Sequence, residues 1–240
     1  MTMLLPFLDE WNGGHLLWSE TYPGLALRGE SRKAALAKLP GELRRYCRWL
    51  DVPVPTDLTL TWEEHPSALS IQDADSDAIL PSELTPLTTA EYAAGRDLAL
   101  RSAGDFLALY RSIPEKDALL RPRRKTFYGP IPATAEEMYQ HTKNVNAYYF
   151  GEIGVEVGND PDILACRRRG FALLERQPDF LQNPAFDGSY GETWTLRKLL
   201  RRFLWHDRIH ARALHLRAAG RFGPDTVADP FFFGGSDLSG

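Results

Sequence analysis

The stretch "WTLRKLLRRFLWHDRIHARAL", residues 194–214, repeats apolar residues at helical spacing and carries two histidines one turn apart. Residues three and four apart share one face of a helix. The stripe that they form here consists of Leu199, Phe203, His206, His210 and Leu214. The neighbouring arginines lie largely off this stripe, at Arg201, Arg202, Arg208 and Arg212. The pattern predicts a helix from about Thr195 to Ala219, ended by Gly220, with both histidines pointing into the protein.

Three earlier segments have the same helical signature. Residues 88–113 begin with a threonine cap and an acidic first turn, which favour a helix N-terminus. Residues 134–154 repeat this pattern, and their last glycine is the expected end of the helix. Residues 160–178 have Asp160 as the expected cap and Pro161 at the first helical position. Four helices joined in this order predict a four-helix bundle.

The first 80 or so residues predict a small α+β unit. Apolar runs at 14–21 and 24–29 flank a Pro-Gly turn signal, and 57–62 alternates apolar and polar residues, so all three are predicted strands. We also expect a strand at 68–72. The segment 31–50 has a serine cap and helical periodicity, and its internal proline must bend or interrupt the helix.

A proline-rich polar stretch at 78–89 separates the two patterns and marks a domain boundary. We therefore expect a mainly α protein with two domains: a small α+β domain over 1–82, and a four-helix bundle with a C-terminal tail over 83–240. The phenylalanines of the tail are expected to pack back on the protein.

Composition narrows the function classes. The chain has 240 residues, of which 43% are hydrophobic, and a net charge of -4, so it lacks the basic field that nucleic-acid binding usually requires. No stretch reads as a signal peptide or a membrane span, and two cysteines without CxxC spacing imply neither a disulfide framework nor a zinc ribbon. We expect a cytoplasmic protein that binds neither nucleic acid nor a membrane.

Charge is distributed unevenly along the chain. Residues 51–95 hold nine acidic side chains and no lysine or arginine, whereas 193–222 hold eight basic residues and only Asp207 as an acid. The asymmetry indicates either two units that face each other electrostatically or an acidic linker followed by a basic helix.

The pair His206 and His210 can reach one metal ion, but catalytic zinc-type sites commonly need a third protein ligand. His141 is the best candidate, because it lies on another predicted helix. Periodicity assigns to the core the face Met138, His141, Val145 and Tyr148. The alternative is that His141 is a core histidine bonded to a carbonyl group. The remaining histidines are less suited: His15 and His65 lie in the first unit, and His215 is rotated away from His210.

These two helical segments resemble the DinB/YfiT-like superfamily of metal-binding four-helix bundles, over about residues 88–222. In that family one histidine comes from the second helix, and an HxxxH pair comes from the fourth, behind a "W-[ST]-x-R-x-[LV]" lead-in. The matching residues are His141, His206 and His210 as ligands, with Trp194, Thr195, Arg197 and Leu199 as the lead-in. The first domain resembles the HicB-like fold, in which a strand pair with a central Pro-Gly leads into an alanine-rich helix, here Pro23-Gly24 and then Ser31 to Ala35.

The resemblance implies a divalent transition metal, zinc or nickel before others, and metal-assisted transfer of a low-molecular-weight thiol to a small-molecule substrate, or hydrolysis. The alternative is a binding or sensor module, including a homodimer, with the HicB-like domain supplying the contact. A third reading is a structural metal closed by a fourth ligand such as Glu152 or Asp207.

Residues outside the triad carry weaker hypotheses. Arg202 or Arg208 could bind carboxylates of the thiol, although a solvated basic helix face is the simpler expectation. Asn144 and Tyr148 could orient a bound water. Cys166 is flanked by arginines that could lower its pKa, but a buried helical thiol is the commoner case. We therefore predict no general base or nucleophile.

Overall fold

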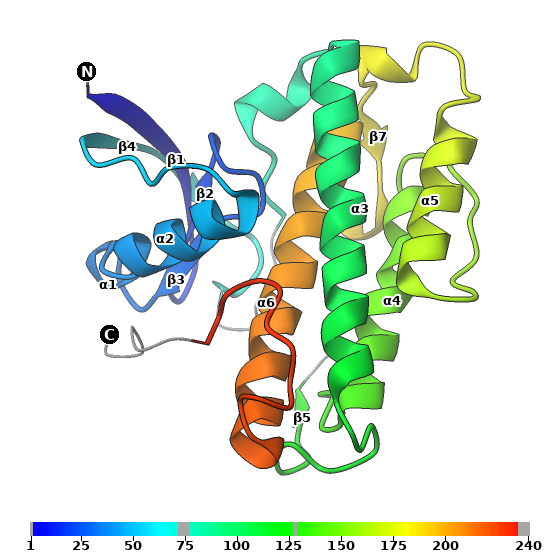
Figure 1. Cartoon of the computed structure of the whole chain (residues 1–240). Helices are drawn as coiled ribbons and strands as arrows, with labels where there is room; N and C mark the ends of the chain where they lie inside the picture. The colour runs from blue at the N-terminus through cyan, green and yellow to red at the C-terminus, as the bar shows by residue number, and fades with distance from the viewer. Residues whose placement is uncertain (1, 72–76, 127–128, 235–240) are drawn as a thin grey trace. The chain divides into compact units, whose positions relative to one another are not determined.

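The computed structural model describes residues 2–71, 77–126 and 129–234. The chain divides into two compact units, of which the first ends at Glu83 and the second is Leu84–Gly234. We call them the N-terminal unit and the helical unit. The protein is mainly α with an α+β N-terminal part, as the sequence predicts (Figure 1).

The N-terminal unit is one mixed sheet with two short helices. Its strands are β1 (Met3–Trp11), β2 (His15–Ser19), β3 (Ala26–Gly29) and β4 (Leu58–Pro66), and its helices are α1 (Arg32–Leu36) and α2 (Leu39–Leu50). The sheet order is β3-β2-β1-β4, in which β1 pairs antiparallel with β2 and parallel with β4. The predicted helix is interrupted near its proline, as expected: Pro40 lies in the first turn of α2, where a missing N–H costs no helical hydrogen bond.

The central strand β1 is present in the structure but was not predicted from the sequence. Pro6 and the adjacent acids Asp9 and Glu10 argue against a central strand, because a proline cannot donate to the ladder and charged side chains are rarely buried. The structure accommodates the proline and the two acids. The pairing with β2 begins only at Phe7, after the proline, and the two buried acids accept hydrogen bonds from side chains. The strand expected at 68–72 is not formed over 68–71, and Gln72 lies outside the described residues.

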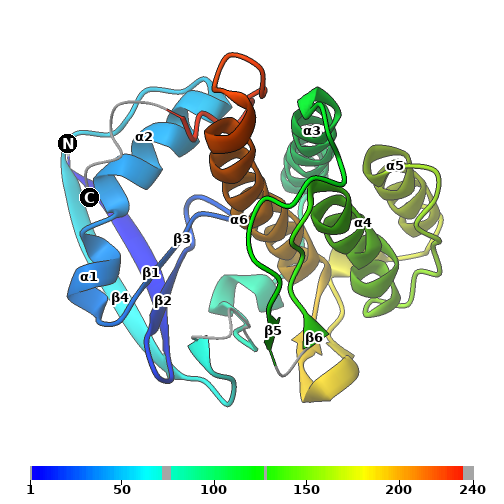
Figure 2. The ribbon, with the colours of Figure 1, turned by 90° about the horizontal axis from the view of Figure 1, so that it is seen from below.

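The helical unit is built on four longer helices. They are α3 (Thr89–Ser112), α4 (Ala135–Gly151), α5 (Ile163–Leu174) and α6 (Leu196–Phe222). Both α3 and α4 contact α5 on one side and α6 on the other, an arrangement that is visible nearly end-on in Figure 2. The connections contain the short strand pairs β5–β6 (Lys125–Thr126, Gly129–Pro130) and β7–β8 (Phe186–Asp187, Thr193–Trp194) and the 3-10 turns η3 (Phe180–Gln182) and η4 (Ser189–Gly191); a further 3-10 turn, η2 (Pro81–Leu84), precedes α3.

The helix N-termini follow their predicted caps with one exception. Capping boxes form at Thr88 with Glu91 and at Thr134 with Glu137, so each threonine side chain accepts from a backbone N–H and each glutamate reaches back to the cap. The cap of α5 is Asp162, not Asp160, because the helix starts only after Pro161.

Two predicted helix ends are wrong by about one turn. Helix α4 ends at Gly151, three residues before Gly154. Helix α6 continues through Gly220 to Phe222, and its cap is Gly223, whose φ of 95° favours glycine.

Aromatic side chains fill the core of the helical unit. Tyr149, Phe150, Phe171 and Phe203 are all at most 2% exposed and contact one another ring to ring. The tail also packs on the protein as predicted for its described part, since Phe231 and Phe233 are buried. Among the described residues, none of the helices combines the length and apolar character that crossing a bilayer needs.

Candidate metal centre

The structure brings His141, His206 and His210 together. His141 projects from α4, and the other two project from α6, which packs against α4. The Nε2 atom of His210 lies 3.1 Å from Nε2 of His141 and 3.1 Å from Nε2 of His206. The three candidate ligand atoms all lie within 4.8 Å of one another. The cluster therefore joins residues 69 positions apart in sequence at one point between two helices.

The spacing of these nitrogens fits a metal ion. A transition metal held at about 2.0–2.1 Å by imidazole nitrogens separates its ligands by about 3.4 Å in tetrahedral and about 2.9 Å in octahedral geometry. The distance from His210 Nε2 to each of the other two nitrogens, 3.1 Å, falls between these values. A neutral ring nitrogen is either a donor or an acceptor, so His210 Nε2 cannot satisfy two neighbouring nitrogens in full. A shared cation would satisfy all three lone pairs.

Desolvation favours the neutral form of the three rings, which is the form that binds metals. Burial is the main cause that lowers the pKa of His206 and His210 well below the ordinary 6.5, and the charges of neighbouring histidines lower both values further. The pKa of His141 is also lowered by desolvation. Metal binding requires deprotonated imidazole nitrogens, so the site is prepared for it at neutral pH.

The three rings differ in access to solvent. His206 is only 6% exposed, His210 is partly exposed and His141 is exposed. Of the residues that the sequence assigns to the core face of α4, Met138 is buried and Val145 and Tyr148 are partly buried. His141 itself is exposed, so the expectation is wrong for this residue. His141 lies at the edge of this face and reaches His210 from there.

A buried ion pair supports the histidine helix. Asp207 follows His206 but points away from the cluster, toward Arg167 of α5, and both side chains are fully buried. The guanidinium also donates to Asn146 Oδ1 at 3.0 Å and to the carbonyl of Ala99 at 3.1 Å. Its carbon lies 3.9 Å from the ring centroid of Phe203. This network ties α6 to the other three helices at the level of the site.

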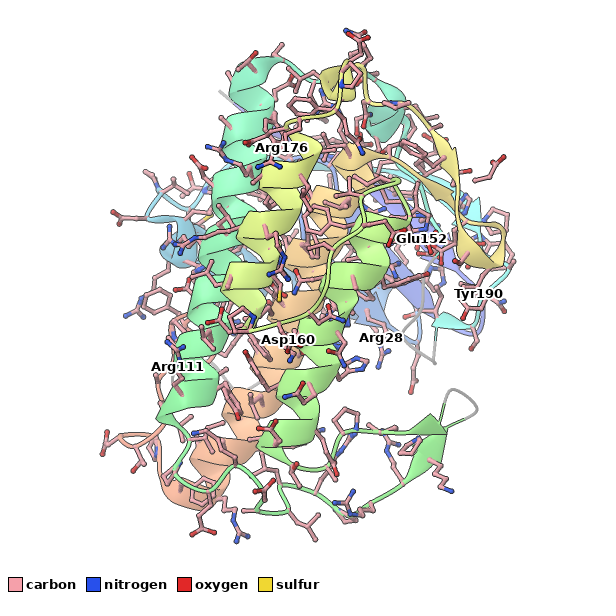
Figure 3. All side chains as sticks on the ribbon, turned by 90° about the vertical axis from the view of Figure 1, so that its right-hand side faces the viewer. Arg28, Arg111, Glu152, Asp160, Arg176 and Tyr190 are labelled. Carbon is pink, nitrogen blue, oxygen red and sulfur yellow. The ribbon has the colours of Figure 1, made fainter. Side chains whose placement is uncertain are left out.

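Neither residue considered as a fourth ligand joins the cluster. Asp207 is occupied by Arg167, and Glu152, at the end of α4 (Figure 3), accepts from the backbone N–H of Ser189 at 2.6 Å. Within the described residues, the group that could hold an ion consists of the three histidines alone. The buried Nδ1 of His206 has no hydrogen-bond partner in this part of the chain, so its ring is oriented by packing rather than by a bonded outer partner.

The arginines of α6 do not form the solvated face that the sequence suggests. Arg201, Arg202 and Arg208 are 2%, 5% and 5% exposed. The guanidinium of Arg202 lies 5.0 to 5.6 Å from the ring centroids of Tyr149, Trp194 and Trp205. These aromatic faces explain how a charged helix face is buried, and the spacing of arginines alone could not indicate it.

The other residues singled out from sequence take structural positions. Tyr148 is half-buried against Trp194, with a ring centroid separation of 5.9 Å. Asn144 is exposed. Burial raises the pKa of Cys166, and this effect exceeds the opposite effect of Arg169. Ring nitrogen Nδ1 of His215 lies 3.2 Å from the carbonyl oxygen of Ala228, outside the cluster.

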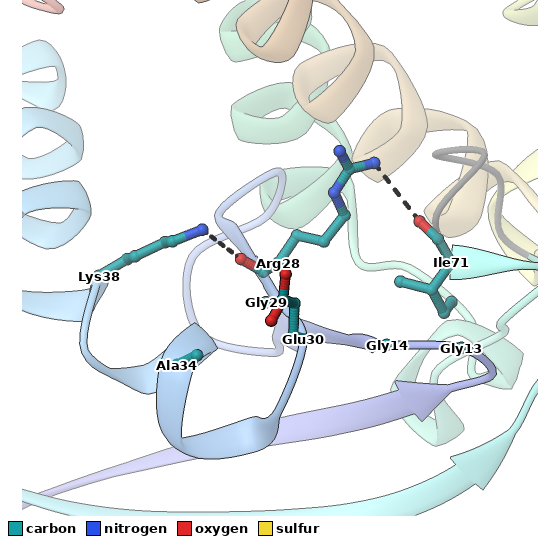
Figure 4. A pocket seen from close by; sticks show the side chains of 8 residues that line it. All are labelled: Gly13, Gly14, Arg28, Gly29, Glu30, Ala34, Lys38 and Ile71. Atoms are coloured by element: carbon teal, nitrogen blue, oxygen red, sulfur yellow. Dashed lines mark hydrogen bonds between the residues drawn. The ribbon is translucent and has the colours of Figure 1, made fainter.

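The N-terminal unit holds a separate cavity of about 560 Å³ beside the β1–β2 turn (Figure 4). Its two cations are already engaged with backbone carbonyls: Lys38 Nζ donates to Arg28 O at 2.6 Å, and Arg28 Nη1 donates to Ile71 O at 3.4 Å. The two remaining histidines, His15 and His65, also belong to this unit; each lies beside an aspartate, Asp9 or Asp77.

Comparison of the chain with family models, with curated proteins and with solved structures found no match in any of the three. The fold and the site define a mainly α protein with three histidines close enough to hold a metal ion. Functional reasoning therefore starts from the chemistry of these imidazoles and of the residues around them.

Proposed function

We propose that this protein is a metal-dependent enzyme whose helical unit is a four-helix bundle of the DinB/YfiT-like type. The observation that carries the proposal is the convergence of His141, His206 and His210 between α4 and α6, with Nε2 of His210 lying 3.1 Å from Nε2 of each of the other two. The lead-in from Trp194 supports it further, because Thr195 caps the helix that presents the histidine pair. Zinc and nickel are the metals that we propose first.

The exposure of the three rings favours a catalytic over a structural metal. His206 anchors the site in the core, whereas His141 faces solvent and leaves a direction from which a substrate can approach. Structural zinc sites are usually closed by four protein ligands, and here three are available in the described residues. A divalent ion bound by three neutral imidazoles supplies Lewis acidity that lowers the pKa of a bound water or thiol.

Transfer of a low-molecular-weight thiol to a small-molecule substrate is the activity that we propose, with hydrolysis as the alternative reaction of the same site. In this proposal the chain positions the thiol at the three histidines, and the substrate approaches from the exposed side of His141. Cys47 and Cys166 are buried free thiols, which supports a reducing, cytoplasmic location.

A second candidate function is a binding or sensor module with a HicB-like N-terminal unit. The observation that favours it is the exposure of Trp11 and Trp62, 45% and 44%, on adjacent strands of which β4 is an edge. Exposed aromatic residues beside a free strand edge suit a contact with a protein partner or with a second copy of the chain.

Elemental analysis paired with a thiol-transfer screen separates these functions. We expect the wild type to carry about one equivalent of a transition metal, and His210→Ala to lose both the metal and the transfer activity. His65→Ala, in the N-terminal unit, is the matched control and should keep both. Metal in the wild type with equal transfer rates in wild type and His210→Ala would contradict the enzyme. Failure of the wild type to take up any transition metal would contradict the metal site itself.

A structural metal predicts a different pattern. In that case His206→Ala would unfold the helical unit, because the binding energy of a structural metal is folding energy. We expect instead that the helical circular dichroism of His141→Ala, whose ring is exposed, matches that of the wild type while its affinity for the metal falls.

A further inference from the structure

The cavity beside the β1–β2 turn has the dimensions of a small-molecule site. Its volume of about 560 Å³ lies within the range of about 300–1,000 Å³ that is typical of ligand pockets. Ile71, which is only 1% exposed, gives it a buried apolar surface, and Gly14 and Gly29 line it with main chain alone. Three charged side chains also line the cavity, namely Arg28, Glu30 and Lys38 (Figure 4). The cavity therefore combines an apolar surface with charges of both signs.

These three charged side chains are not paired with one another or with other ions. In the described part of the chain none of them belongs to an ion pair, although Arg28 and Glu30 lie only two positions apart in sequence. The next arginine, Arg32, differs from Arg28 because it pairs with both Asp9 and Glu64. Unpaired charges of opposite sign in one cavity are available to a molecule that brings the complementary charges.

Two backbone carbonyls hold the cations in place. Arg28 Nη1 donates to the carbonyl of Ile71 at 3.4 Å, and Lys38 Nζ donates to the carbonyl of Arg28 at 2.6 Å. Figure 4 shows the guanidinium directed toward Ile71 and Lys38 reaching the strand from the other side. Each contact uses a single donor, so most of the N–H donors of both side chains remain for a bound molecule.

We propose that this cavity binds a small zwitterion of the amino-acid type, in which a short apolar chain joins a carboxylate to an ammonium group. The carboxylate accepts hydrogen bonds from the guanidinium of Arg28, the ammonium group donates to Glu30, and the chain lies against Ile71. Because Lys38 adds a second cation to the lining, positive charge is in excess and a simple amine is disfavoured. This site makes the N-terminal unit a ligand-binding unit, independently of the histidine cluster.

Matched series of small molecules test this inference. Amide resonances of isotope-labelled full-length protein would be followed during titration with glycine, 4-aminobutyrate and 6-aminohexanoate, whose two charges lie at increasing separations. Acetate, butyrate and hexanoate lack the ammonium group, and alkylamines of the same lengths lack the carboxylate. At least one zwitterion should bind about fivefold more tightly than the acid and the amine of its own length, as one partly exposed ion pair at each end predicts.

The same spectra locate the bound molecule. The amide resonances of Gly14 and Gly29, which line the cavity, should shift during the titration. The resonance of Gly24, in the β2–β3 turn and outside the lining, should stay in place.

Single substitutions separate the two ends of the zwitterion. Arg28→Gln should remove its advantage over the amine of the same length, and Glu30→Gln should remove its advantage over the acid. Both side chains are exposed, so neither variant should disturb the fold. Lys33→Gln is the matched control, because Lys33 is an exposed cation of α1 that does not line the cavity; it should keep the affinity for the zwitterion within about twofold.

Two outcomes would overturn the inference. One is a wild type that binds the zwitterions no more tightly than the acids and amines, or that binds none of these molecules. The other is a preference for zwitterions that persists in both Arg28→Gln and Glu30→Gln. The titration needs no metal, so either result leaves the proposed function of the histidine cluster to its own test.

Discussion

Substitution of Asp207 by asparagine tests the buried network that holds the histidine helix. The side chains of Asp207 and Arg167 are both 0% exposed and form a two-pronged ion pair. The asparagine side chain would keep the shape and one acceptor oxygen but remove the charge. The guanidinium would then remain buried among Asn146 Oδ1, the carbonyl of Ala99 and the ring of Phe203, none of which carries a negative charge.

The expected cost follows from this arrangement. Removal of one partner from a buried ion pair costs about 3–5 kcal/mol, because it leaves an uncompensated charge. The remaining acceptors around Arg167 place Asp207→Asn at the lower end, about 3 kcal/mol. Native proteins are stable by only about 5–15 kcal/mol, so the variant should lose a large part of the stability of the helical unit.

Urea unfolding followed by far-ultraviolet circular dichroism measures this loss, since the four longer helices belong to one unit. Asp97→Asn is the matched control: its carboxylate is 65% exposed and pairs with Arg96, so its removal should change the unfolding free energy by less than about 0.5 kcal/mol. The double variant Arg167→Met, Asp207→Leu should recover most of the loss. A loss below about 1 kcal/mol in Asp207→Asn would refute the reasoning.

Two further predictions concern packing and pH. A Cβ on Gly170 would lie 2.1 Å from the ring of the fully buried Phe150. Gly170→Ala should therefore lower the unfolding free energy of the helical unit by about 1–3 kcal/mol in the same urea titration. The control is Gly104→Ala on α3, whose Cβ would meet nothing closer than 3.8 Å and which should not be destabilising. The backbone N–H of Thr88, followed by its hydroxyl and by Arg197, lowers the pKa of Glu91 from 4.5 to about 2. A carboxylate whose pKa is lowered by folding stabilises the protein above its unfolded pKa, and this stabilisation is lost as the pH falls from about 4.5 to 2. The unfolding free energy should therefore fall less steeply with decreasing pH in Glu91→Gln than in the wild type. Equal slopes in the two proteins below pH 4.5 would contradict this role.

The helices of this protein were predictable where caps and periodicity agree. Thr88 and Thr134 each stand three residues before a glutamate and directly before an apolar repeat, and both are the observed caps. The start of α5 was misplaced because two aspartates flank Pro161, and either could cap the helix by composition. Strand β1 was missed because the partners of its buried acids, Arg32, His15 and Trp18, come from other elements.

The candidate site was predictable in its residues but not in its surroundings. The spacing of His206 and His210 on a striped helix indicates a shared direction, and His141 follows from a second helix. Periodicity could not show that His141 stays exposed, nor that Arg202 is buried among aromatic rings.

X-ray absorption at the metal edge of the zinc-loaded full-length protein tests the central claim most directly. The account predicts about three imidazole nitrogens at about 2.0–2.1 Å, and about two in His141→Ala. The set of ligands around the zinc should be unchanged in His215→Asn, because His215 lies outside the cluster. A first shell with thiolate ligands, or one that is the same in wild type and His141→Ala, would contradict a metal centre built on His141, His206 and His210.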